Sequence, residues 1–160
     1  MELSTIQRGV SVTATDRLDQ TNRFLDVLEA ADRTAIAEML DDQVVWSSPM
    51  SSSGNAEDAH PAQGREAFGS RLGSISGLMR SARFIDRRIT VSADGATTFV
   101  QARGDFLTAD GRPYRNVYVF RFDWRDDKIV SWEEYANPIT ILRTFPDQYG
   151  PLIEGLLRGD

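Results

Sequence analysis

The chain has 160 residues, of which 41% are hydrophobic and 26% are charged, and its formal net charge is −6. This length suits one domain with a buried core, and the acidic balance argues against nucleic-acid binding, which needs a basic surface. The sequence has no cysteine and a single histidine, which excludes disulfides, thiolate chemistry and multi-histidine metal sites. No segment reaches the length of a membrane span. We therefore expect a cytoplasmic protein that uses carboxylate, arginine, tyrosine and hydroxyl chemistry without a metal or a cofactor.

Helices dominate the first half of the chain. In order, the predicted segments are a flexible arm at 1–13, a helix at about 16–30, a short helix after Asp32, a strand at 44–46, a polar loop at 49–61 and a third helix from about residue 63. The first helix is indicated by Leu18, Leu25 and Leu28, which share one side at helical spacing. Asp32 is a favourable N-cap for the second helix because its side chain can accept a backbone hydrogen bond.

Strands dominate the second half. Runs of β-branched and aromatic residues predict strands at about 83–92, 96–108, 112–124 and 128–136. Asp94-Gly95 and Asp110-Gly111 are strong hairpin signals, and residues 125–127 predict a third turn. Consecutive tight turns indicate an antiparallel meander, and helices followed by a sheet define the α+β class. A C-terminal tail is predicted at 146–160.

The predicted strand at 112–124 carries both polar and aromatic side chains on a single face. Its even-numbered side chains share that face, and they are Tyr114, Asn116, Tyr118, Phe120, Phe122 and Trp124. Polar groups at one end and aromatic groups at the other favour the wall of a ligand pocket over a dry core.

The predicted strand pairing gathers two carboxylates around an arginine. A two-residue turn after the second strand places Arg103 opposite Tyr118, with Asp105 opposite Asn116, and a three-residue turn after the third places Tyr118 opposite Glu134. A slip of one residue would turn these side chains to the other face. Two carboxylates beside a guanidinium can hold different protonation states, as an acid/base catalyst requires. The alternative is an ion-pair network on an exposed sheet face.

Several segments resemble one known fold. They are Ala35–Met39, Gly64–Phe68, Asn116–Phe120 with Lys128–Val130, and Glu134–Pro138. Together with the order of helices and strands, they resemble the cone-shaped fold shared by nuclear transport factor, ketosteroid isomerase, SnoaL-type polyketide cyclases and limonene epoxide hydrolase. The resemblance implies one domain at 14–145, with three N-terminal helices packed on a strongly curved antiparallel sheet around an internal pocket. It also implies a homodimer formed through the sheet.

The motifs are most similar to those of limonene epoxide hydrolase. That family has Arg-x-Asp, Gly-Arg-x-Tyr and Trp-x-Asp-Tyr where this chain has Arg103-Gly104-Asp105, Gly111-Arg112-Pro113-Tyr114 and Trp132-Glu133-Glu134-Tyr135. The resemblance implies Glu134 as general base, Asp105 as general acid and Arg103 as their bridge. The implied function is cofactor-free epoxide hydrolysis, or epoxide-opening cyclisation, of a small apolar molecule from secondary metabolism. Trp46 and Ser48 replace the residues that hold the attacking water in that family, which favours cyclisation or an isomerisation.

Other members of the fold keep different functions open. At the catalytic positions of ketosteroid isomerase this chain has Phe24, Ser48 and Tyr118, so steroid enolisation by that machinery is not expected. Phenazine-biosynthesis proteins resemble the region of Tyr114, Asn116 and Glu134, which keeps an isomerase or cyclase without an epoxide in view. A binding protein for small molecules and an assembly module are further alternatives. The predicted substrate-binding residues are Tyr118, Asn116, Trp46, Ser48, Phe24, Trp132, Tyr114 and His60.

Overall fold

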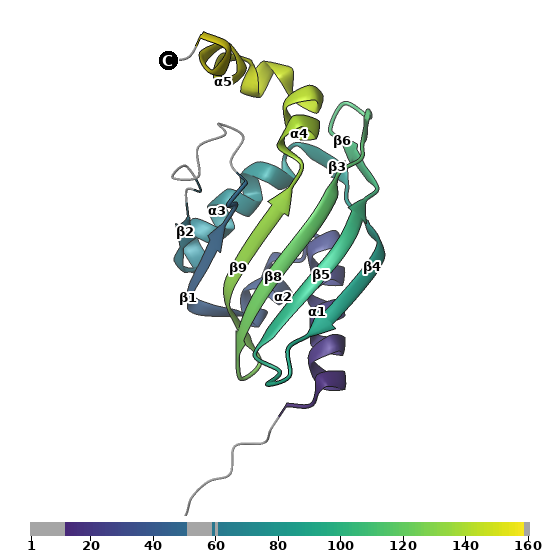
Figure 1. Ribbon diagram of the computed structural model, residues 1–160, viewed down its shortest axis with the longest axis vertical. Helices are drawn as coiled ribbons and strands as arrows, with labels where there is room; N and C mark the ends of the chain where they lie inside the picture. The colour runs from purple at the N-terminus through teal and green to yellow at the C-terminus, as the bar shows by residue number, and fades with distance from the viewer. Residues whose placement is uncertain (1–11, 51–58, 60, 159–160) are drawn as a thin grey trace, which may run out of the picture.

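The computed structural model describes residues 12–50, 59 and 61–158 (Figure 1). In chain order the elements are α1 (Ala14–Glu29), α2 (Arg33–Met39), β1 (Leu40–Ser47), β2 (Ala62–Gln63), α3 (Gly64–Ser76), β3 (Met79–Ser81), β4 (Phe84–Val91), β5 (Thr97–Gly104), β6 (Phe106–Thr108), β7 (Pro113–Tyr114), β8 (Val117–Arg125), β9 (Lys128–Ala136), α4 (Pro138–Thr144) and α5 (Pro146–Arg158). The α+β class is confirmed. Most of the predicted arm, most of the polar loop and His60 lie outside the described residues. None of the helices in this part of the chain is long and apolar enough to span a membrane.

A curved sheet forms the main layer of the fold. Its six strands have the order β2-β1-β9-β8-β5-β4, and a smaller sheet has the order β3-β6-β7. Figure 1 shows the large sheet as a curved wall, with α1 and α2 behind it and α3 beside β1. Because β1 runs parallel to β9, the expectation of a wholly antiparallel sheet is wrong. The edge strands β2 and β4 do not pair with each other, so the sheet stays open and is not a closed barrel.

Capping side chains mark the starts of α1 and α2. Thr13 and Asp16 form a reciprocal capping box at the start of α1. Asp32 caps α2 by accepting a hydrogen bond from the Ala35 N–H at 3.0 Å, as predicted. Among the described residues, two helices precede the first strand and α3 follows β1 and β2, in the order predicted along the chain. The three N-terminal helices that the resemblance implies are therefore wrong, and two more helices follow β9. The N-terminal helix α1 packs on the sheet through Phe24, which is fully buried.

The register between β5 and β8 differs by one residue from the prediction. Arg103 lies opposite Val117, not opposite Tyr118. The cause is the turn between β6 and β7, which contains the three residues 109–111 and not two. Gly111 ends this turn with a φ of 84°, the left-handed conformation that glycine adopts readily. Because a shift of one residue exchanges the two faces of a strand, Arg103 points outward with Val117, whose exposed fraction is 58%.

The register between β8 and β9 differs by two residues. Glu134 lies opposite Phe120, not opposite Tyr118. The turn holds residues 126–127 alone, and a bulge beside Trp124 adds one further residue to β9. Because side chains alternate along a strand, a register shift of two residues leaves each side chain on the same face, and Glu134 keeps its predicted orientation. It points to the inner side of the sheet together with Phe120, which is buried.

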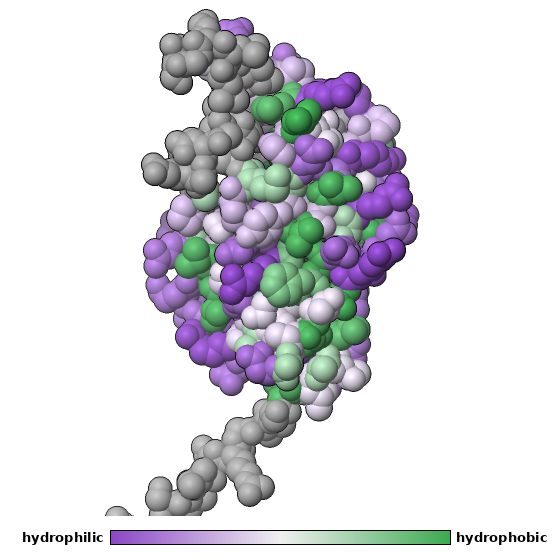
Figure 2. All heavy atoms as spheres, viewed as in Figure 1, coloured by the Kyte–Doolittle hydropathy of each residue, from purple (hydrophilic) through white to green (hydrophobic). Residues whose placement is uncertain are grey.

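The inner face of the sheet forms an aromatic core, and the outer face is mixed. All six even-numbered side chains from Tyr114 to Trp124 are buried on the inner face. Of the six, Tyr114 and Tyr118 line a pocket, as predicted, whereas Phe120, Phe122 and Trp124 belong to the core, so the predicted pocket wall is only part of this face. Figure 2 shows the outer face, on which apolar side chains lie among polar ones. The exposed apolar residues of β5 and β8 there are Phe99, Val117 and Val119. Pairing of two chains through this face stays a prediction.

Candidate functional site

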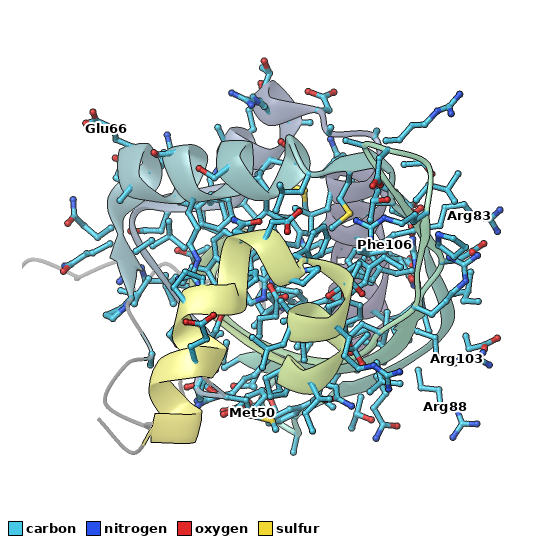
Figure 3. All side chains as sticks on the ribbon, turned by 90° about the horizontal axis from the view of Figure 1, so that it is seen from above. Met50, Glu66, Arg83, Arg88, Arg103 and Phe106 are labelled. Atoms are coloured by element: carbon cyan, nitrogen blue, oxygen red, sulfur yellow. The ribbon has the colours of Figure 1, made fainter. Side chains whose placement is uncertain are left out.

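A pocket of about 370 Å³ lies on the inner side of the sheet. The strands contribute Trp46, Tyr118 and Trp132 to its wall, α3 contributes Arg71, and the segment after α4 contributes Phe145. Seen from above, α4 and α5 cross the space between α3 and the sheet (Figure 3). The volume falls within the range of roughly 300–1,000 Å³ that is common for small-molecule sites.

Glu134 brings a carboxylate into this pocket. Its neighbours Glu133 and Tyr135 point to the outer face, where the Glu133 carboxylate accepts hydrogen bonds from Arg121 at 3.4 Å and from Tyr135 at 2.9 Å. Glu134 shares the inner face with Trp132, as alternation along a strand requires. Its side chain is half-buried, and it lines the cavity. Glu134 therefore lies on the inner face, where the strand pattern places it, and its catalytic role stays a prediction.

The surroundings of Glu134 raise its pKa toward neutral pH. Burial raises the pKa of Glu134 to about 7 from an ordinary value of 4.5. The positive charge of Arg71 and the indole of Trp46 lower this pKa, but they do not offset the loss of water around the carboxylate. A carboxyl group with such a pKa can both accept and donate a proton at physiological pH.

Arg71 lies beside Glu134, and the sequence analysis missed it. Its guanidinium donates to the Ser48 hydroxyl at 2.7 Å and to the Trp46 carbonyl at 3.5 Å, and it lies 4.4 Å from the centroid of the Trp46 ring. Burial lowers the pKa of Arg71, and the charge of Glu134 raises it. The available signal was its spacing, because Arg71 follows the buried Phe68 by three residues and so shares its side of α3.

Two stacked tryptophans form part of the pocket wall. Trp46 and Trp132 lie opposite each other in the β1–β9 ladder, with ring centroids 4.6 Å apart and an interplanar angle of 11°. Both indole N–H groups are buried, and neither has a hydrogen-bond partner among the described residues. The Trp46 indole is near enough to lower the pKa of Glu134 without reaching hydrogen-bond geometry.

Two tyrosine hydroxyls add neutral donors to the site. Tyr114 and Tyr118 both line the pocket. Burial raises the pKa of both phenols, and the nearby charge of Glu134 raises them further. Both therefore stay protonated at physiological pH and can donate hydrogen bonds. Asn116 is buried behind them and donates to the Tyr114 oxygen at 2.9 Å.

The structure does not bring the predicted triad of Asp105, Arg103 and Glu134 together. Arg103 points away from the interior (Figure 3) and pairs with Asp86 at 3.1 Å. Asp105 lies in the link between β5 and β6 and pairs with Arg115 at 2.6 Å. The one-residue register shift between β5 and β8 is the cause. Of the three residues, Glu134 alone lines the pocket.

The other predicted substrate-binding residues fall into three groups. Those that line the pocket are Trp46, Ser48, Tyr114, Tyr118 and Trp132. Phe24 belongs to the core, where its ring packs edge-on against Phe122 at 5.3 Å between centroids. Asn116 is also buried, and it reaches the site through Tyr114. His60 lies outside the described residues.

A second carboxylate of the pocket is already engaged. Glu29 accepts hydrogen bonds from the Phe84 backbone N–H and, at 2.7 Å, from Arg87. Within the part of the chain that the structure describes, no three acidic or histidine side chains lie close enough to bind one metal ion together. Glu134 is therefore the pocket carboxylate best placed for proton transfer.

Comparison of the sequence with known proteins agrees with the fold. The sequence profile of the SnoaL-like domain family matches residues 21–132. The uncharacterized protein YesE of Bacillus subtilis is 23% identical over 124 residues, which cover 77% of this chain and 82% of that protein.

Solved structures share the same architecture. A Bacillus subtilis protein that is provisionally named an isomerase has a TM-score of 0.70 and 20% identity, over 81% of this chain and 92% of its own. A Xanthomonas campestris protein provisionally named a polyketide cyclase has a TM-score of 0.63 and 19% identity, over 76% and 90% of the two chains. A phenazine biosynthesis-related protein from Pseudomonas aeruginosa has a TM-score of 0.64 and 15% identity, over 87% and 88%. Because the family profile covers most of the chain, the protein belongs to the SnoaL-like domain family.

Proposed function

We propose that the protein is an acid/base isomerase or cyclase that acts on a small, largely apolar carbonyl compound, with Glu134 moving the proton. The observation that carries this proposal is one available carboxylate, with a pKa of about 7, inside an aromatic-lined pocket. An assembly module would be expected to fill its cone with Trp46 and Trp132, but these rings leave a cavity of about 370 Å³. Two similar structures are provisionally named an isomerase and a polyketide cyclase, which agrees with this class of reaction.

The first step removes a proton from the substrate. The Glu134 carboxylate takes the proton from the carbon next to the substrate carbonyl. The electron pair of that C–H bond becomes the C=C bond of an enolate, and the negative charge moves to the oxygen. The neutral hydroxyls of Tyr114 and Tyr118 donate to this oxygen, and such hydrogen bonds strengthen as the acceptor becomes charged.

The second step returns the proton and decides the product. Where the substrate carries a C=C bond next to the deprotonated carbon, the enolate is a conjugated dienolate, and delivery of the proton from Glu134 to its far carbon shifts the double bond, which is isomerisation. If the enolate carbon instead attacks a second carbonyl of the same molecule, a C–C bond forms. The proton then passes from Glu134 to the new alkoxide, which is cyclisation. Both routes return Glu134 to its carboxylate form.

Epoxide opening, which the sequence motifs favoured, has less support from the geometry. It needs an acid that protonates the epoxide oxygen, and the predicted acid Asp105 pairs with Arg115 at 2.6 Å and does not line the pocket. The pocket hydroxyls of Tyr114 and Tyr118 have a raised pKa, which makes them weak acids. Enolate chemistry needs only hydrogen-bond donation from these groups.

Proton exchange with solvent tests the proposal without knowledge of the natural substrate. A panel of small apolar ketones, enones and diketones is incubated with the protein in D₂O, and deuterium at the carbon next to the carbonyl is measured by mass spectrometry. We expect exchange with the wild type and a loss of about 10²–10⁴-fold in Glu134→Gln, which is the usual contribution of a positioned proton-transfer group. Glu133→Gln is the matched control, because Glu133 lies next in the chain but on the outer face.

The same experiment separates the alternatives. Compounds that bind without exchange in the wild type would indicate a binding protein and contradict the proposal. Equal exchange in Glu134→Gln and the wild type would contradict the role of Glu134. Apolar epoxides are included in the panel, and diol or cyclic ether formed from them without ketone exchange would instead support epoxide opening.

A further inference from the structure

A buried polar cluster lies directly behind the pocket wall. It consists of Tyr114, Asn116 and the backbone of Asn137, which is the N-cap of α4. The side chains of Tyr114 and Asn116 are each 4% exposed. The Asn116 amide nitrogen donates to the Tyr114 oxygen at 2.9 Å and to the Asn137 carbonyl at 3.2 Å. The cluster therefore connects a pocket hydroxyl to the point where β9 leads into α4.

The orientation of the Asn116 amide is fixed by its surroundings. Its oxygen accepts hydrogen bonds from the Val117 N–H at 2.8 Å and from the Asn137 N–H at 3.1 Å. A rotated amide would place its NH₂ group against these two backbone donors and its oxygen against the Asn137 carbonyl. Because both contacts would be repulsive, the amide nitrogen must face Tyr114.

This orientation determines the direction of the Tyr114 hydrogen. The Tyr114 oxygen accepts from Asn116, so its own hydrogen cannot point toward the amide. A phenol has one hydrogen to donate, and the ring of Tyr114 lines the pocket. Burial raises the pKa of Tyr114, while the hydrogen bond donated by Asn116 lowers it. A hydroxyl polarised in this way is a stronger donor than an isolated one.

We infer that Asn116 is a positioning residue that turns the Tyr114 hydroxyl into the pocket, where it forms a subsite for an uncharged carbonyl oxygen of the ligand. This inference deepens the proposed function, on which its catalytic meaning rests. The binding subsite itself depends on the cluster of Tyr114, Asn116 and Asn137 and not on proton transfer by Glu134. The ligand class is therefore an apolar ketone or enone whose carbonyl approaches β7 and α4.

The test uses 1-indanone, an aromatic ketone, as the probe. Hydrogen bonding lowers the stretching frequency of a carbonyl, so the infrared spectrum of the bound probe reports the donor directly. Affinity is followed by the fluorescence of the wall residues Trp46 and Trp132. We expect a lowered frequency with the wild type. Tyr114→Phe should lose this shift and bind about tenfold more weakly, as removal of one buried hydrogen bond predicts. Tyr135→Phe is the control on the outer face and should match the wild type.

Two changes at Asn116 test its positioning role. Asn116→Ser removes the amide donor without adding charge and should behave like Tyr114→Phe. Asn116→Asp should lose the carbonyl shift at high pH and regain it at low pH, because the introduced carboxyl becomes a donor to Tyr114 only when it is protonated. A residue with a structural role alone would show no such rescue. The double variant with Tyr114→Phe should lose nothing further, since both changes remove the same interaction.

The inference fails if the carbonyl shift persists in Tyr114→Phe. It also fails if both folded Asn116 variants keep the shift at every pH. The Glu134→Gln variant separates this result from the proposed function. A retained carbonyl shift in that variant, together with an absence of exchange in the wild type, would contradict the proposed function but support the subsite.

Discussion

The guanidinium of Arg71 stacks over the ring of Trp46, 4.4 Å from its centroid, and its charge acts on Glu134. The three residues come from α3, β1 and β9, so elements distant in the sequence meet at one end of the pocket. The hydrogen bond to Ser48 at 2.7 Å holds the guanidinium from another side. Trp46 and Ser48 therefore anchor a positive charge that moderates the pKa of Glu134, while burial still dominates it.

The buried carboxylate predicts a stability that depends on pH. The folded-state pKa of Glu134, about 7, lies above its ordinary value of 4.5, so the folded protein binds more protons between these values. The free energy of unfolding therefore falls as pH rises through this window, by about 3 kcal/mol at most. Glu134→Gln removes this loss. The free energy of unfolding of Glu134→Gln, relative to that of the wild type, should therefore rise by that amount between about pH 4 and about pH 8.

Urea unfolding at several pH values measures this difference. Glu133→Gln, which changes the neighbouring carboxylate on the outer face, is the control and should follow the wild type. A difference between Glu134→Gln and the wild type that stays constant with pH would show that Glu134 has an ordinary pKa.

Loss of the Arg71 charge should move the pH dependence of activity. The guanidinium lowers the pKa of Glu134, so Arg71→Met should shift the rise of the exchange rate with pH to higher values. Arg71→Lys keeps the charge and should shift it less. Ser48→Ala removes the hydrogen bond that holds the Arg71 guanidinium but removes no charge. The pH midpoint of its exchange rate should therefore stay close to that of the wild type. A midpoint that moves downward in Arg71→Met would contradict the assigned electrostatics.

Gly104 leaves room for the ring of Tyr118. A Cβ atom at this position would lie 3.0 Å from Cε2 of Tyr118 and 3.4 Å from the Phe106 ring. Gly104→Ala should therefore displace Tyr118 and lower the free energy of unfolding by roughly 1–3 kcal/mol, the usual cost of overpacking. The control is Gly69→Ala in α3, where an added Cβ atom would meet no atom within 4 Å apart from its chain neighbours and the backbone of its own helix. It should raise stability by about 0.5–1 kcal/mol, because alanine is the better helix former. Thermal unfolding of both variants shows whether the signs differ.

Arg103 and Asp105 should be dispensable for activity. Arg103 pairs with Asp86 and Asp105 with Arg115 in ion pairs that are open to solvent. Exposed pairs of this kind contribute about 0–1 kcal/mol to stability. Arg103→Ala and Asp105→Asn should therefore change the exchange rate by less than about twofold. A loss comparable to that of Glu134→Gln in either variant would instead support the triad that the motifs predict.

Turn length explains why part of the site could be predicted and part could not. The alternation in β8 and β9 places Glu134 and Tyr118 on the inner face, and the β8–β9 register differs by an even number of residues, which preserves that face. The Asp110-Gly111 pair fits both a two-residue turn and a three-residue turn with glycine in the left-handed conformation. The longer turn occurs, and a difference of one residue moves Arg103 to the outer face.

The remaining site residues depend on contacts between distant elements. The charge of Arg71 acts on Glu134 because α3 packs against β1. The spacing from Phe68 indicates which side of α3 carries Arg71 but not what lies opposite that side. The role of Asn116 follows from the return of β9 beside it, since Asn137 provides two of its partners. The cap at Asp32 is a local signal and marks the start of α2, whereas α1 begins at Ala14 after the Thr13 cap, two residues before its predicted start.

A direct titration of the Glu134 side chain tests the central claim most sharply. The protein is labelled with ¹³C at the glutamate carboxyl carbon, and the Glu134 signal is assigned by its absence from Glu134→Gln. We predict that its chemical shift changes with a midpoint near pH 7. A midpoint near 4.5, the ordinary value for a glutamate, would show a solvated carboxylate and contradict the proposed proton transfer.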